Sequence, residues 1–257
     1  MKRKRLKPEQ AIKLGLTPKP KEGKRNARYT LTPEQVELLK PNFNRVLAIG
    51  DIHEPFTLDG YLEFCKEQYK KYKCNKVVFI GDIIDNHYSS YHETDADGMG
   101  GATELNLAKV KLSEWYKAFP DADITIGNHD RMIMRKAQTS AIPSAWIKEY
   151  KDVLNTPGWN FTDRVVIDGV QYIHGEGGTA RTKAKADMMS TVQGHLHTQC
   201  YVEHFVGANY KIFGMQLGCG IDHDAYAMAY AKRGKKPAIG CGVIIGGKTA
   251  INCLMEL

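Results

Sequence analysis

Residues 76–85 read KVVFIGDIID, an apolar run that ends in a glycine and two carboxylates. A short apolar run closed by glycine is typical of a buried strand whose chain turns sharply at the carboxyl end. The same arrangement occurs twice more, as RVLAIGDIH at residues 45–53 and as DITIGNHD at residues 123–130. Because open α/β sheets bind their ligands at the carboxyl ends of the strands, the three segments predict a polar site at one sheet edge.

The rest of the pattern predicts the architecture. Helices are expected over residues 61–72, 102–119 and across 131–151, and strands over residues 165–167, 170–173, 191–193, 201–205, 211–217, 242–245 and 250–254. The pairs Asp168-Gly169 and Gly246-Gly247 each separate two of these strands and are strong hairpin signals. Parallel-type strands followed by antiparallel ones indicate an α/β fold, a four-layer α-β-β-α sandwich of two packed mixed sheets flanked by helices.

The composition limits the class of protein. The chain has 257 residues, of which 42% are hydrophobic and 25% are charged, which excludes a collagen, a wholly disordered chain and a membrane bundle. No apolar run approaches the ~20 residues of a spanning helix, and Lys13, Pro18 and Pro20 interrupt any signal-peptide core. We therefore expect no membrane association and a cytoplasmic location. The six scattered cysteines form no CxxC pair, which favours reduced thiols.

The positive charge is concentrated at the N-terminus. Residues 1–28 hold eleven Lys and Arg against two Glu, whereas the other 229 residues hold 25 Lys and Arg against 27 acidic residues. This predicts a flexible basic arm at residues 1–28 and a single domain at residues 29–257. A flexible basic segment attracts a polyphosphate backbone, so nucleic acid is a possible partner. A solvated tail is the alternative.

Two later motifs add imidazoles, His174-Gly175 and the GHLH at residues 194–197. Taken alone, each such residue would be interpreted as a cap, a turn former or a surface residue. Together the motifs supply seven donors: Asp51, His53, Asp82, Asn128, His174, His195 and His197. Mixed oxygen and imidazole donors suit divalent transition metals, and seven donors exceed the needs of one four-coordinate ion. The sequence therefore predicts two divalent ions that share a bridging carboxylate, with Mn²⁺ favoured and Fe, Zn, Co or Ni possible.

The ordered set of five motifs, from Gly50 to His197, resembles the calcineurin-like metallophosphoesterase superfamily. The resemblance assigns ligands to each ion: Asp51, His53 and His197 to the first, and Asn128, His174 and His195 to the second. It implies that Asp82 bridges the two ions. It also implies that His129 faces the substrate, is held by Asp85 and assists the leaving oxygen. For Asp130 we favour a supporting position over direct catalysis.

The resemblance implies a metal-dependent phosphoric ester hydrolase in which a hydroxide bridging the two ions attacks phosphorus. The serine/threonine phosphatases carry Arg-Gly after the second motif and Glu at the end of the third, whereas this chain has Asn86-His87 and Asp130. The chain looks more like the bacterial and phage-type phosphoesterases, which would place it in the host cytoplasm if it is phage-encoded. We therefore expect a phosphodiesterase or nuclease acting on nucleic acid or nucleotides.

Two other functions stay open at this point. One is a phosphomonoesterase acting on small molecules or phosphoproteins, and the other is a nucleic-acid-binding module with a vestigial metal site. His87, Arg181 and Lys183 are the candidate substrate contacts, with a solvated loop or helix face as the alternative. The sequence does not indicate an oligomeric state.

Overall fold

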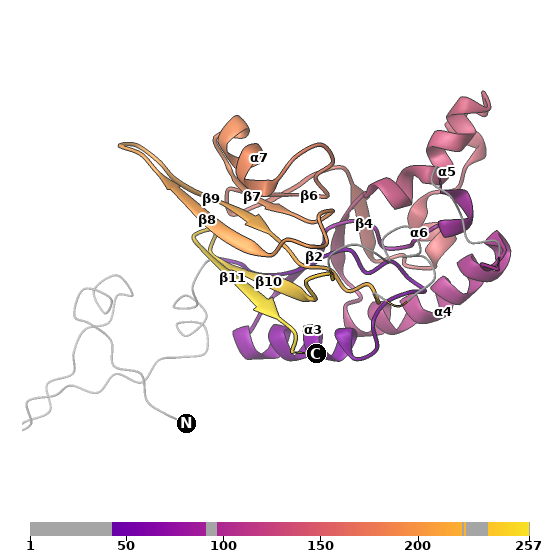
Figure 1. Ribbon diagram of the computed structural model, residues 1–257, viewed down its shortest axis with the longest axis horizontal. Coiled ribbons are helices and arrows are strands. Elements are labelled where there is room, and N and C mark those ends of the chain that lie inside the picture. Colours follow the sequence, from indigo (N-terminus) through magenta and orange to yellow (C-terminus); the bar gives the residue numbers. More distant parts are fainter. Residues whose placement is uncertain (1–42, 91–96, 223, 225–235, 257) are drawn as a thin grey trace, which may run out of the picture. The chain divides into compact units, whose positions relative to one another are not determined.

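Two β-sheets packed face to face organise the chain (Figure 1). The computed structural model describes residues 43–90, 97–222, 224 and 236–256. The first sheet has the order β11-β10-β1-β2-β3-β4, and the second has the order β5-β6-β7-β9-β8. The first sheet consists of β1 (Arg45–Ile49), β2 (Lys76–Phe79), β3 (Ala122–Thr125), β4 (Trp159–Thr162), β10 (Gly240–Ile245) and β11 (Thr249–Leu254). The second consists of β5 (Val165–Ile167), β6 (Val170–Ile173), β7 (Ser190–Gln193), β8 (Tyr201–Val206) and β9 (Lys211–Gln216).

Both sheets are mixed. In the first, β1 to β4 pair in parallel, whereas β1, β10 and β11 pair antiparallel. In the second, β6, β7 and β9 are parallel, and the hairpins β5–β6 and β8–β9 are antiparallel. The helices are α3 (Tyr61–Tyr72), α4 (Gly101–Ala118), α5 (Asn128–Thr139), α6 (Tyr150–Leu154) and α7 (Ala180–Asp187), with short 3₁₀ turns η1 (His87–Ser89) and η2 (Ser144–Trp146).

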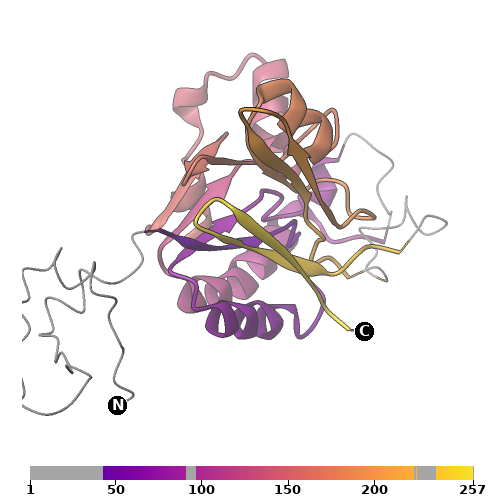
Figure 2. The same cartoon turned by 90° about the vertical axis from the view of Figure 1, so that its left-hand side faces the viewer.

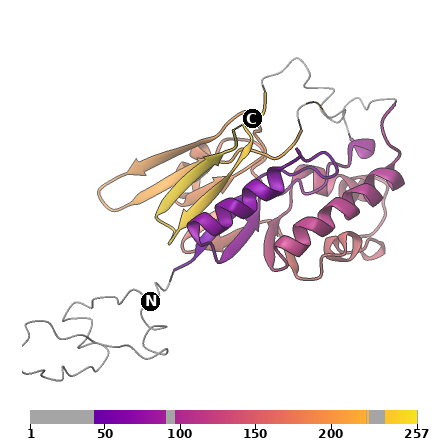
Figure 3. The same cartoon turned by 90° about the horizontal axis from the view of Figure 1, so that it is seen from below.

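Alternating side chains of β1 explain why the first sheet is buried on both faces. Leu47 and Ile49 pack in a cluster with residues of α3 and α4, which lie side by side over that face (Figure 3). Val46 and Ala48 point the other way, into a cluster that contains Tyr172 and other residues of the second sheet. A strand covered on both faces is apolar along its buried length, as residues 46–49 of β1 are.

The helix α7 covers the outer face of the second sheet and completes the four layers (Figure 2). Its close approach depends on Gly214 of β9, because a Cβ at that position would lie only 2.8 Å from the main chain of Ala180. The predicted four-layer sandwich of two mixed sheets flanked by helices is confirmed.

Most of the expected helices and strands form, and both predicted hairpins do. Asp168, Gly169, Gly246 and Gly247 adopt positive φ values at the two turns, as a tight hairpin turn requires. The six cysteines are free thiols, as expected. In the described part of the chain, no helix combines the length and the apolar character that a membrane span needs.

The helical material expected across residues 131–151 is present as three separate segments. α5 begins three residues earlier, at Asn128, and ends at Thr139, and η2 and α6 follow as separate turns. Pro143 immediately precedes η2 and cannot continue a helix, because it lacks the amide hydrogen that the preceding turn would use. The strand β4 was not expected. The arm at residues 1–28 lies outside the described residues, so the division into arm and domain stays a prediction.

The aromatic side chains around Phe79 allow a test of the hydrophobic core between the first sheet and its helices. The Phe79 ring centroid lies 5.7 Å from that of Trp115 and 4.9 Å from that of Trp159. We expect Phe79→Ala to lower the free energy of unfolding by about 3–5 kcal/mol in urea titrations, because a cavity replaces a fully enclosed ring. Val206→Ala, at a position 70% exposed, should change it by less than about 0.5 kcal/mol. Similar values for the two variants would contradict this description of the core.

Candidate metal centre

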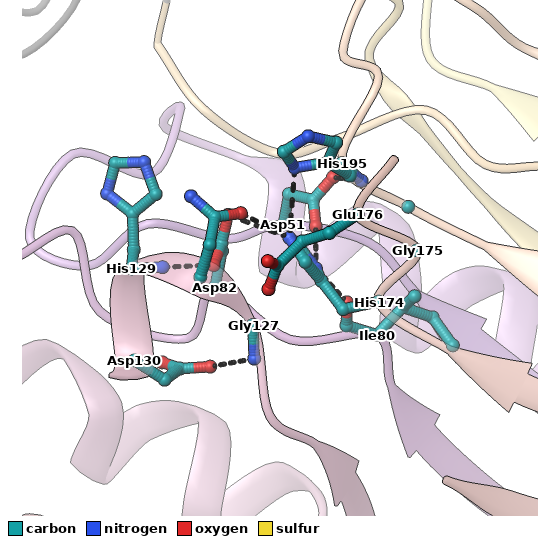
Figure 4. A network of polar contacts seen from close by, with 12 residues as sticks. Asp51, Ile80, Asp82, Gly127, His129, Asp130, His174, Gly175, Glu176 and His195 are labelled. Carbon is teal, nitrogen blue, oxygen red and sulfur yellow. Dashed lines mark hydrogen bonds and ion pairs between the residues drawn. The ribbon is translucent and has the colours of Figure 1, made fainter. Parts of the chain in front are cut away.

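The polar motifs that follow the strands converge at one edge of the two sheets (Figure 4). Four of the residues involved, Asp51, His53, Asp82 and His195, have left-handed backbone conformations with φ between 26° and 67°. Such conformations cost free energy in non-glycine residues and cluster at functional sites. Glycine is required beside two of them. A Cβ on Gly127 would collide with Asp82, and a Cβ on Gly194 would lie 2.7 Å from Asp51 Oδ1.

His53, Asp82 and His197 form the first group of donors, and Asp51 lies beside them. His53 Nε2 lies 3.2 Å from His197 Nε2 and 3.6 Å from Asp82 Oδ2. Asp51 Oδ2 lies 3.7 Å from His197 Nε2. Two imidazole nitrogens face each other here beside two carboxylates, an arrangement in which a shared cation is favourable.

The second group lies beside the first and includes the same carboxylate. His174 Nε2 lies 3.2 Å from Asp82 Oδ2, 3.2 Å from His195 Nδ1 and 2.8 Å from Asn128 Oδ1. Asp82 therefore belongs to both groups. The seven residues expected to bind two metals are thus brought together, with Asp82 between the two sets.

Hydrogen bonds outside the cluster fix which ring nitrogens point inward. His174 Nδ1 donates to the main-chain carbonyl of Ile80 at 2.8 Å, and His53 Nδ1 donates to Asp85 Oδ1 at 2.7 Å. Each ring then directs Nε2 toward the cluster, and this nitrogen can coordinate a metal once it has lost its proton. In the described part of the chain, Asp51 Oδ1 is buried without a hydrogen-bond partner. An orphaned carboxylate oxygen facing imidazoles fits a divalent ion.

The electrostatics of the pocket favour positive charge. Burial alone would lower the pKa of His53, but its hydrogen bond to Asp85 and the charge of Asp82 raise that pKa to about 9. Burial likewise opposes protonation of His174, yet the charges of Asp82 and Asp51 hold its pKa well above the usual value. Protons on these two rings balance the buried carboxylates, a role that divalent ions can also fill.

One ring of the cluster stays neutral near pH 7. Burial and the nearby positive charge of His53 lower the pKa of His197 to about 4. A neutral imidazole has a lone pair for a metal, so His197 fits the ligand role that the sequence resemblance implies.

His129 and Asp85 lie beside the first group, and their contact differs from the expected one. His129 Nδ1 lies 2.6 Å from the main-chain carbonyl of Asp85 and 3.5 Å from its carboxylate. That carboxylate makes its short bond to His53 instead. Asp85 therefore holds His129 mainly through its main chain and orients His53 through its side chain. The side chain of His129 is 16% exposed, which leaves it accessible to a substrate.

The three candidate substrate contacts lie in different surroundings. His87 is buried, with Nδ1 3.9 Å from Asp85 Oδ2. Arg181 stacks over the ring of Tyr201 at 4.3 Å and pairs with Glu203 at 3.3 Å. Lys183 pairs with Asp187, four residues along α7, at 3.3 Å. Their contact with a substrate stays a prediction.

Asp130 ties two of the motif loops together. Its Oδ2 accepts a hydrogen bond from the amide of Gly127 at 2.8 Å, and its Oδ1 accepts one from the amide of Ile83 at 3.0 Å. The loop that carries Asp82 and the start of α5 are thereby held in register. This is the supporting position that the sequence suggested.

An ion pair that the sequence analysis did not identify links α5 to the loop after β6. Arg131 contacts Glu176 at 2.5 Å and Asp163 at 3.0 Å. Asn128 lies one turn before Arg131, and His174 lies two residues before Glu176, so the pair connects the two segments that supply the second group of donors. Figure 4 shows Glu176 beside Asp82 and His174. The only sequence signal was an acidic residue directly after the His174-Gly175 motif.

The two-sheet fold and its paired donor groups are those of the metallophosphoesterase class, and the comparison with protein families agrees with that class. The profile of the calcineurin-like phosphoesterase family matches residues 44–204, which is more than half of the chain. The chain belongs to this family.

The solved structures that the chain resembles are distant in sequence. Vacuolar protein sorting 29 from Cryptosporidium parvum is 13% identical, with 84% of this chain and 98% of that chain covered and a TM-score of 0.43. YfcE, a phosphoesterase from E. coli, is 14% identical, with 77% and 87% covered and a TM-score of 0.38. No curated protein sequence matches the chain.

The Arg131–Glu176 pair can be tested through metal affinity. We expect Arg131→Gln to weaken one of two Mn²⁺ binding steps about 10- to 100-fold in calorimetric titrations, because the pair aligns Asn128 with His174. Glu176→Gln should do the same, and the double variant should lose little more than either single one. Lys117→Gln, which breaks a surface pair with Glu114, should bind both ions normally. Equal weakening of both steps, or of neither, would rule out this role.

The contribution of Glu104, in α4, to folding stability should depend on pH. Its buried carboxylate accepts a hydrogen bond from the amide of His87 at 2.8 Å. Burial raises the pKa of Glu104 to about 7, with the charge of Asp85 adding to the effect and the amide hydrogen bonds opposing it. Between pH 4.5 and 7 the folded protein then holds a proton that the unfolded chain releases, so Glu104 makes stability fall as pH rises through this window.

Glu104→Gln removes that titration and supplies the measurement. We expect the free energy of unfolding of the unsubstituted protein to fall relative to that of the variant between pH 5 and 7, by up to about 1.4 kcal/mol per pH unit. Urea titrations in the presence of a chelator would measure both proteins. Parallel profiles would show that Glu104 titrates normally.

Proposed function

We propose that this protein is a metal-dependent phosphodiesterase that cleaves nucleic acid or nucleotides. The observation that carries the proposal is the position of Asp82 in both donor groups, with His129 next to them. A shared carboxylate between two sets of nitrogen and oxygen donors is the arrangement that a two-ion phosphoester site requires. Mn²⁺ is the ion we propose for both positions, because a mixed set of oxygen and imidazole donors suits a divalent transition metal.

Different residues of this chain would have different roles in such a reaction. Divalent ions, when bound, neutralise phosphate oxygens and make water more acidic. His53, His197 and Asp51 would hold one ion, and Asn128, His174 and His195 the other. The amide of His129 donates to Asp82 Oδ1 at 2.9 Å, which keeps the other oxygen of Asp82 directed at both groups.

His129 is the proposed proton donor to the leaving oxygen. Its Nδ1 is occupied by the carbonyl of Asp85, so Nε2 is the atom left to exchange a proton with a substrate. Because the neighbouring ring of His53 lies edge-on at 4.6 Å between centroids, the imidazole of His129 is confined on one side. General acid catalysis of this kind contributes about 10²–10⁴-fold in rate.

The preference for nucleic acid rests on the basic arm and on the resemblance to bacterial and phage-type phosphoesterases. A segment with eleven basic and two acidic residues would retain a polyanionic substrate near the site, in a salt-dependent way. Such an enzyme would work in the cytoplasm.

Substrate assays would test the proposal. With Mn²⁺, the protein should hydrolyse bis-p-nitrophenyl phosphate and cleave single- or double-stranded DNA. Turnover of p-nitrophenyl phosphate alone would indicate a phosphomonoesterase. Metal binding and salt-sensitive DNA retention without turnover of any ester would indicate a binding module.

Variants would test the roles of the residues. Asn128→Ala and His195→Ala should each abolish turnover in a folded protein. His129→Ala should keep the metal content, measured by mass spectrometry, and lose about 10²–10⁴-fold in rate on esters with poor leaving groups. His204→Ala, an exposed histidine on β8, is the matched control and should retain full activity. Loss of metal from His129→Ala would instead identify His129 as a ligand.

A further inference from the structure

Trp146, at the end of η2, is exposed to an unusual degree. Its side chain is 82% exposed, whereas Trp115 and Trp159 are 1% and 2% exposed. Ile142 in the same segment and Ile133 on α5 are also partly exposed, at 45% and 37%. A large aromatic ring that stays in water beside other apolar side chains marks a site of interaction.

The surroundings of Trp146 are basic. Residues 131–151 contain five Lys and Arg and one acidic residue, and one of the five, Arg131, pairs with Asp163 and Glu176 outside this segment. Arg135 and Lys148 are exposed on either side of η2 in the sequence, and Glu149, the single acidic residue, pairs with Lys151 at 2.9 Å. An exposed aromatic ring among cations is complementary to a polyanion that carries flat bases.

The segment that carries Trp146 is also attached to the candidate metal centre. α5 begins with Asn128 and His129, and η2 packs against α5. Tyr150, at the start of α6, contacts the first turn of α5: its hydroxyl donates a hydrogen bond to the main-chain carbonyl of Asp130 at 3.3 Å. A helix of 12 residues is about 18 Å long, so Trp146 lies within the span of a short oligonucleotide from the centre.

We propose that Trp146 is a stacking platform for an unpaired base of a single-stranded nucleic acid substrate, with Arg135 and Lys148 beside its phosphates. This inference rests on the proposed function and narrows its substrate class. In a duplex the faces of the bases are stacked on one another, so a lone exposed ring selects single strands. Stacking tolerates any base, which suits an enzyme without sequence preference.

The fluorescence of Trp146 itself can report this contact. Because the other two tryptophans are enclosed, quenching of the solvent-exposed tryptophan emission reports on Trp146 alone. We expect oligo(dT) to quench that emission in the full-length protein with chelator present, which prevents cleavage. Binding of fluorescein-labelled oligo(dT), measured by anisotropy, should weaken about 5- to 150-fold in Trp146→Ala and much less in Trp146→Phe.

Controls separate this inference from the proposed function. Val110→Ala, at an apolar position 66% exposed on α4, should bind oligo(dT) normally. The same variant should hydrolyse bis-p-nitrophenyl phosphate at the rate of the unsubstituted protein, because Val110 contributes to neither site. If no ester is hydrolysed but the quenching and the affinity loss are observed, the proposed function fails and the stacking site stands.

Three results would overturn the stacking site. The first is unchanged oligo(dT) affinity in Trp146→Ala. The second is an equal dependence on Trp146 for duplex DNA. The third is self-association in analytical ultracentrifugation that Trp146→Ala abolishes, which would show that a second copy of the chain covers the ring.

Discussion

The buried carboxylate of Asp82 is the constraint on which the centre depends. It is 1% exposed and lies between two groups of histidines. A carboxylate removed from water is costly unless positive charge surrounds it. Burial opposes its ionisation, yet the charges of His174 and His129 hold the pKa of Asp82 well below the usual value. The neighbouring side chains are therefore arranged around a permanent negative charge, and two cations are a natural complement to it.

This arrangement requires strained backbone conformations. The ligand-type residues at the strand ends adopt left-handed backbone conformations, and glycines beside them admit the side chains of Asp51 and Asp82. The hydrogen bonds of Asp130 hold two of these turns at fixed separation. Such supports matter because a donor displaced by 1 Å no longer reaches a shared ion.

The sequence predicted the elements whose signal is local. Bounds of β1 and α3 agree with the apolar runs, and both hairpins form at their turn residues, since strand periodicity and turn chemistry are read over a few residues. The strand β4 has only four residues, so its alternation of apolar and polar side chains is too short to stand out in the sequence, and its pairing with β3 establishes it. The motif residues could be grouped because parallel strands end at a common edge. By contrast, the links from Arg131 to Glu176 and from Asp85 to His53 depend on how distant segments pack, and no local pattern encodes them.

The donors come from both sheets, and this has a consequence for the whole fold. Asp51, Asp82 and Asn128 follow strands of the first sheet, whereas His174 and His195 follow strands of the second. An ion bound by donors from both sheets would connect the two sheets to each other. Its binding free energy would add to the cohesion of the two halves, by an amount that grows with the concentration of free metal. How firmly the two sheets stay packed against each other would then depend on the metal ions present around the protein.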